Sequence, residues 1–151
     1  MLASATSIGV LALEEETVLV LLGDQLEAYW IYEKKVPPKY PMSSLQKNEM
    51  GCVAVGFVIE SDGTTSSHRV LVSYPSKNFN KSAIKAAKQF LYVPSKQNND
   101  REPVFTINTF TYQISNRGKN NDEKIRTTLH EICTKEANKS LNTDTGDASA
   151  G

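Results

Sequence analysis

The chain has 151 residues, which is enough for one domain with a substantial core and too few for two domains that each have a core of their own. Its 39% hydrophobic and 23% charged residues are typical of a globular protein, and no stretch is apolar enough to span a bilayer. Seventeen basic and seventeen acidic residues cancel, so charge points neither to nucleic acid nor to a membrane surface as a partner.

Residues 1–35 form a leader. Its first five residues read MLASA and end in the A-x-A pattern of a signal-peptidase site, but no basic or apolar region precedes that pattern. Either the chain starts inside a secretion signal, or small residues simply follow the first Met. Two short strands are expected, over 17–22 and 28–32. We interpret the aromatic residues of the second as a staple that holds the leader to the core, with a binding platform as the alternative: Tyr29, Trp30 and Tyr32.

A stiff, proline-rich entry over 36–41 precedes the best-patterned part of the chain. Pro41 fits the first turn of a short helix over 42–48, which Gly51 ends. From Cys52 the hydrophobic period is two, which predicts a half-buried strand. Its apolar face is formed by Val53, Val55, Phe57 and Ile59.

The segment 61–64 predicts a hairpin turn, because Gly63 can adopt a positive φ without steric cost. Asp62 is therefore explained by turn geometry rather than by acid catalysis, and the alternation resumes at His68. The next element is a helix over 81–91, which Pro94 stops. We expect its buried stripe to pack on the apolar face of the first strand; the stripe consists of Ala83, Ala86, Ala87 and Phe90.

A polar loop leads to the third strand, Val104–Ile114. The apolar face of this strand changes near Asn108-Thr109, which a bulge or an interface would explain. The segment 116–139 contains an amphipathic helix from about Asp122 to Asn138, with apolar residues at helical spacing. Residues 140–151 have almost no apolar side chain and should be disordered.

The motifs of the central segment share an order and a spacing that resemble the TonB C-terminal domain family. They are Tyr40-Pro41, Gly51-x-Val53-x-Val55-x-Phe57-x-Ile59, Asp62-Gly63, Phe79-x-x-x-Ala83-x-x-Ala86 and Phe90-x-Tyr92-x-Pro94. The resemblance runs from Pro38 to about Ile114, which places the domain at 36–115. The chain departs from the family pattern at Ser44, Phe90-Leu91 and Ser95, where Ala, Trp-Arg and Ala are usual.

The resemblance implies an α+β fold in which two helices pack on a three-stranded antiparallel sheet, with the leader and the C-terminal helix as additions. It also implies a periplasmic protein-protein interaction module, not an enzyme, that accepts a partner segment by β-strand addition. The implied edge is the last strand, made of Phe105, Thr106, Ile107, Asn108, Thr109, Phe110, Thr111 and Tyr112.

The implied partner is a TonB-dependent outer-membrane receptor in energy-coupled transport, or another envelope protein. A full transducer of the family carries a membrane helix and a long proline-rich spacer. In this chain only residues 36–41 resemble that spacer, so we expect a stand-alone TonB-like protein. Two alternatives stay open. The protein is a self-associating structural envelope protein that pairs as a homodimer through sheet edges, or its own leader strands already occupy the edge.

No cofactor or metal is expected, because neither His68 nor His130 has a partner at ligand spacing. Cys52 and Cys133 lie 81 positions apart and lack redox or metal spacing. They form a disulfide if the protein is exported, or remain two ordinary thiols. The only plausible nucleophile and base are Cys52 and His68, and we expect this pair not to be catalytic.

Overall fold

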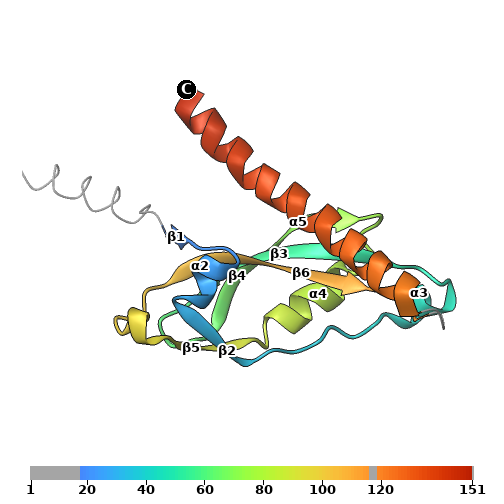
Figure 1. Cartoon of the computed structure of the whole chain (residues 1–151), viewed down its shortest axis with the longest axis horizontal. Coiled ribbons are helices and arrows are strands. Elements are labelled where there is room, and N and C mark those ends of the chain that lie inside the picture. Colours follow the sequence, from blue (N-terminus) through green and yellow to red (C-terminus); the bar gives the residue numbers. More distant parts are fainter. Residues whose placement is uncertain (1–17, 116–118, 151) are drawn as a thin grey trace, which may run out of the picture.

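The computed structural model describes residues 18–115 and 119–150. Its centre is a four-stranded sheet in the order β1-β6-β3-β4, beside a two-stranded sheet of β2 and β5 (Figure 1). The strands are β1 (Leu19–Val20), β2 (Trp30–Lys34), β3 (Gly51–Ile59), β4 (Thr65–Tyr74), β5 (Leu91–Pro94) and β6 (Val104–Tyr112). The helices are α2 (Asp24–Glu27), α3 (Met42–Gln46), α4 (Asn80–Ala87), the 3-10 turn η1 (Lys96–Asn98) and α5 (Lys119–Ala150).

The α+β prediction is confirmed, since β4, β3 and β6 form the expected antiparallel sheet. Two additions extend it. β1 pairs in parallel with the start of β6, and β2 pairs with β5 in a separate antiparallel ribbon. The described part of the leader is thus part of the fold, because its short strands satisfy their main-chain groups against the domain.

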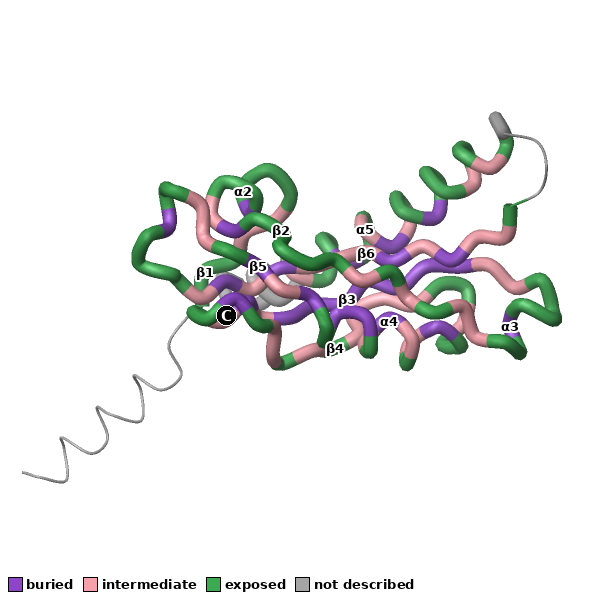
Figure 2. Tube along the Cα trace, turned by 90° about the horizontal axis from the view of Figure 1, so that it is seen from below, coloured by how far each residue is buried: buried purple, intermediate pink, exposed green. Residues whose placement is uncertain are grey.

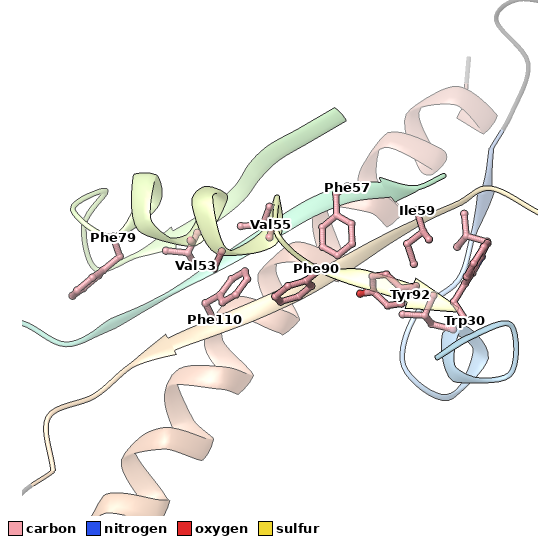
Figure 3. Close-up of a cluster of buried hydrophobic side chains, with 14 of the residues drawn as sticks. Trp30, Val53, Val55, Phe57, Ile59, Phe79, Phe90, Tyr92 and Phe110 are labelled. Carbon is pink, nitrogen blue, oxygen red and sulfur yellow. The ribbon is translucent and has the colours of Figure 1, made fainter. Parts of the chain in front are cut away.

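The larger of two hydrophobic clusters lies on one face of the central strand β3 (Figure 3). The predicted face of β3 packs against the alanine stripe of α4 and against Phe90, as expected, and every one of these side chains is buried. The alanines allow α4 to lie close to the sheet. Phe90 contacts Phe57 edge to face, at 6.1 Å between ring centroids. Burial is concentrated along β3, β6 and α4 (Figure 2).

The helix α5 covers the opposite face of the sheet and then projects beyond it (Figure 1). Cys52 and Ala54 of β3 lie under Leu129, Cys133 and Ala137 of α5. Cys52 and Cys133 are joined in a disulfide, so of the two alternatives for the cysteines the structure has the bridge. A strand covered on both faces is buried throughout, which explains the nearly continuous apolar run of β3.

The change of apolar face within β6 has the same cause. Ile107 packs in the layer under α5, whereas Phe110 and Tyr112 belong to the core on the other face. The register of β6 with β3 runs without a shift from Val104 to Tyr112. The irregular pattern therefore reflects an interface with α5 and not a bulge.

Two boundaries differ from the sequence-based expectation. The helix predicted over 81–91 ends at Ala87, and Leu91–Pro94 becomes β5, because pairing with β2 and burial of Tyr92 outweigh helical propensity. α5 continues to Ala150, through most of the tail expected to be disordered. That tail contains no proline, and its internal Gly146 weakens a helix without breaking it.

Residues 1–17, with the signal-like A-x-A pattern, and residues 116–118 lie outside the described residues. Among the helices that are described, none combines the length and the apolar character needed to cross a bilayer.

Candidate partner-binding edge

The outer edge of β6 is only partly covered. β1 pairs with Val104 and Phe105 alone, and the amide of Leu21 donates to the carbonyl of Phe105 at 3.1 Å. The chain then leaves the edge at Gly23, whose φ of +55° suits a glycine, and enters α2. β1 therefore caps the first part of β6 and ends there.

The direction of the Phe105 carbonyl reveals which main-chain groups of β6 face outward. In a strand, the N–H and C=O of one residue point to the same side, and those of the next residue point to the other side. Ile107, Thr109 and Thr111 therefore present their main-chain groups to the same outer side as Phe105. Within the described part of the chain, no strand pairs with these three residues on that side.

A groove of about 580 Å³ lies at Ile107, the first residue of this uncovered stretch. Its floor includes Ile107 and Asn108 of β6, one wall comes from α2 and β2, and the other wall comes from α5. The wall residues include Leu26, Ile31, Tyr32 and His130. We call this hollow the edge groove. Ile107, the first residue with uncovered outward main-chain groups, thus lies at the edge groove.

The wall formed by β2 is tightly held. Trp30 is 1% exposed and its Nε1 donates to the carbonyl of Glu102 at 2.9 Å. Tyr32 stacks on Tyr92 at 4.7 Å between ring centroids, and its hydroxyl donates to Oδ1 of Asn108 at 3.2 Å. Burial raises the pKa of Tyr32, so this hydroxyl remains a donor at neutral pH. The staple interpretation of the leader aromatics is thus confirmed for Trp30.

Ser95, one of the departures from the family pattern, also fastens this wall. Its amide donates to the carbonyl of Tyr29 at 2.9 Å, and its hydroxyl donates to the carbonyl of Ala28. An alanine at this position would lack the second bond. The substitution therefore fits a chain that docks its leader beside the domain.

The wall formed by α5 is fixed at two neighbouring positions. Cys133 is bonded to Cys52, and Oγ1 of Thr134 lies 2.8 Å from Oγ1 of Thr109 on β6. His130 lies three residues before the disulfide and lines the edge groove. A covalent bond and a hydrogen bond thus fix the position of α5 relative to β3 and β6.

The opposite edge of the sheet, β4, has a different backbone. Its register with β3 shifts twice, between Ala54 and Val55 and between Gly56 and Val58. Ser67, on β4, has a φ of +53°, and Arg69 places its guanidinium over the ring of Phe105. Bulges and charges are the features with which natural proteins discourage pairing at a sheet edge.

All eight residues expected at the binding edge lie on β6. They differ in what they contribute to the edge. Ile107, Thr109 and Thr111 turn their main chain outward, while the side chains of Thr106, Phe110 and Tyr112 are buried in the sheet. Phe105 already pairs with β1, and Asn108 lies in the groove floor.

Sequence reasoning missed the groove walls. The only signal was the aromatic strand at 28–32, since nothing local relates α2 or His130 to β6. These walls approach β6 through contacts between residues far apart in the chain.

The chemistry candidates have structural roles. Cys52 is in the disulfide and has no thiol, so it cannot act as a nucleophile beside His68. The Nε2 atom of His68 lies 2.8 Å from Oγ1 of Thr65. Asp62 accepts bonds from the amide and hydroxyl of Thr64 in the hairpin turn, as turn geometry predicts. The described residues contain no group of three or more side chains suited to a metal ion.

Comparison with known proteins agrees with this architecture. Residues 36–114 match the family model of the Gram-negative bacterial TonB protein C-terminal. The solution NMR structure of the Pseudomonas aeruginosa TonB CTD is 25% identical, with a TM-score of 0.51 over 58% of this chain and 89% of that chain. The Helicobacter pylori TonB-CTD is 23% identical, with a TM-score of 0.41 over 52% and 71%. The search of curated proteins finds no match.

The matched family is one of periplasmic interaction domains and is not enzymatic. The match spans more than half of the chain and contains β3, β4, α4, β5 and β6. β1, α2, β2 and α5 lie outside it. This chain therefore belongs to the Gram-negative bacterial TonB C-terminal family.

Proposed function

We propose that this protein is a periplasmic interaction module that accepts an extended partner segment as an added strand along β6, between Phe105 and Tyr112. The observation that carries the proposal is the contrast between the two sheet edges. β6 is regular and has unpaired outward groups beside a groove, whereas β4 is bulged. Family membership supports the same mode.

Strand addition uses main-chain hydrogen bonds for affinity and alternate side chains for specificity. Ile107, Thr109 and Thr111 offer three outward N–H and C=O pairs. At about 3.3 Å per residue, a partner segment of roughly five residues would satisfy them. The family favours an outer-membrane receptor in energy-coupled transport as the source of this segment, followed by another envelope protein.

The main-chain donors of β6 test this mode directly. Thr109→Pro removes an outward N–H, whereas Thr109→Val keeps that N–H and removes the hydroxyl that contacts Thr134. The full chain is immobilised and exposed to envelope extract. The wild type and the Thr109→Val variant should capture the same receptor, and the Thr109→Pro variant should not capture it. Circular dichroism verifies that each variant is folded. Capture by a folded Thr109→Pro variant would contradict strand addition at this edge.

Sedimentation against concentration addresses the alternative of self-association. A module that serves a different partner should remain a monomer as its concentration rises. A dimer that Thr109→Pro dissolves would instead show that two copies pair through β6.

The periplasmic location is tested by osmotic shock of cells that express the full-length gene. The protein should appear in the shock fluid together with a periplasmic marker. Recovery with the cytosolic marker would contradict export.

A further inference from the structure

The edge groove is built mainly from parts of the chain outside the family match. Residues 36–114 supply Ile107 and Asn108 of its floor, while Leu26, Ile31 and Tyr32 precede the match. His130 follows it. A bare sheet edge offers only main-chain groups, which every extended peptide can satisfy. Walls beside the edge add side-chain contacts, through which partners can be distinguished.

Among the described residues, no strand pairs with the outer side of β6 beyond Phe105. β1 ends at Val20, and the chain turns away at Gly23, which lies at the end of the groove nearest β1. The stretch of β6 that follows lies in line with β1 and exposes the same kind of outward groups. An extended segment is therefore the shape that both the edge and the groove accept.

The wall formed by β2 is apolar and open to solvent. Ile31 is 50% exposed, although it lines a concave site, and its cross-strand neighbour Val93 is 37% exposed. Glu27 and Lys35 also line the groove with opposite charges, so charge selects neither an acidic nor a basic segment. The Lys35 ammonium is in addition held over the Tyr32 ring, 4.8 Å from its centroid.

Alternate side chains of an added strand point to opposite faces of the sheet. Those on the face of β2 would lie next to Ile31, where an apolar side chain removes exposed apolar surface from water. We propose that the edge groove selects extended partner segments with an apolar side chain on the face of β2, and that Ile31 is the specificity-determining residue. This inference rests on the proposed strand addition at β6.

Two synthetic peptides test the selection on the full chain. One is Lys-Thr-Val-Thr-Val-Thr-Lys, and in the other both valines are replaced by serine. Covering the half-exposed Ile31 with a valine should strengthen binding roughly tenfold. Titrations of ¹⁵N-labelled protein give the dissociation constants, and the amides of Ile107, Thr109 and Thr111 report where each peptide binds.

Ile31→Ser should weaken binding of the valine peptide about tenfold and leave the serine peptide unaffected. The matched control is Val93→Ser, which removes a similar side chain on the neighbouring strand, outside the groove lining, and should change neither affinity. Both positions are exposed enough for the variants to fold. Unchanged valine-peptide affinity in Ile31→Ser, with the β6 amides still shifting, would overturn the selection and leave strand addition intact. Failure of both peptides to shift the β6 amides would overturn both.

Discussion

β4 and β6 flank the same central strand, yet only one of them is suited to receive another strand. β6 matches β3 residue for residue from Val104 to Tyr112, whereas the pairing of β4 with β3 shifts twice. An edge strand that bulges twists its N–H and C=O groups out of line, and a straight edge keeps them in register for a partner. Backbone regularity, more than composition, therefore separates the two edges.

The two edges also differ in their surroundings. β6 lies between β1, the wall formed by β2 and the α5 wall, so its uncovered part opens into a groove. β4 is the terminal strand of its sheet, and within the described residues no further strand follows it. The bulges of β4 therefore disfavour pairing at that edge, whereas the regular edge of β6 is partly uncovered and opens into the edge groove.

The largest loss of stability is expected when the disulfide that holds α5 on the sheet is removed. α5 packs across β3, β4 and β6 and is held by the disulfide. Cys133→Ser should lower the free energy of unfolding by about 2–4 kcal/mol, because the bridge closes a long loop. Urea denaturation measures this loss, and wild-type protein in reductant should show a similar one. An unchanged midpoint in both samples would mean that α5 docks without the bridge.

The central strand supports both edges from the core side. Phe57→Ala should cost on the order of 3 kcal/mol, since it leaves a cavity among fully buried rings. The thermal melting temperature should fall accordingly. Val93→Ala, at a half-exposed position, is the control and should change stability by less than about 0.5 kcal/mol. Equal melting temperatures for wild type and Phe57→Ala would contradict the assigned core face.

A pair of proline variants sharpens the assignment of outward groups on β6. Asn108 turns its N–H toward β3 and Thr109 turns its N–H away, so only Asn108→Pro removes a bond between these strands. Asn108→Pro should therefore be less stable than Thr109→Pro by about 1–2 kcal/mol. The control variant Asn108→Ala keeps the main-chain N–H and loses only the side-chain contact with Tyr32. Equal unfolding free energies for the two proline variants would show that the outward groups are misassigned.

The smallest effect concerns the β4 edge and depends on pH. Burial lowers the pKa of His68, with a further contribution from the nearby Lys88 charge. The folded state therefore binds the proton less readily than the unfolded chain does. The contribution of His68 to stability should be fully present above about pH 6.5, the ordinary histidine value, and decline as the pH falls below it. His68→Gln should remove this part of the pH dependence of the unfolding midpoint, and an identical pH profile would contradict it.

Local patterns were sufficient for the family-like part of the fold except β5. The period of two in β3, the Asp62-Gly63 turn and the alanine stripe of α4 each specify an element and its buried face, because side-chain direction follows from backbone geometry. The candidate edge could also be predicted, since resemblance to the family pointed to the last strand. The walls of its groove could not.

What the sequence determined by itself was therefore the three antiparallel strands, the helix α4 and their apolar faces, which depend on neighbours within a few residues. Only the tertiary structure decided that Leu91–Pro94 is a strand, that Cys52 meets Cys133, and that Ile107 faces α5. It likewise decided that β1 stops at Val20 and leaves the rest of the β6 edge to a groove. Each of these features joins segments distant in sequence, and such contacts form only because burial and main-chain pairing outweigh local preference.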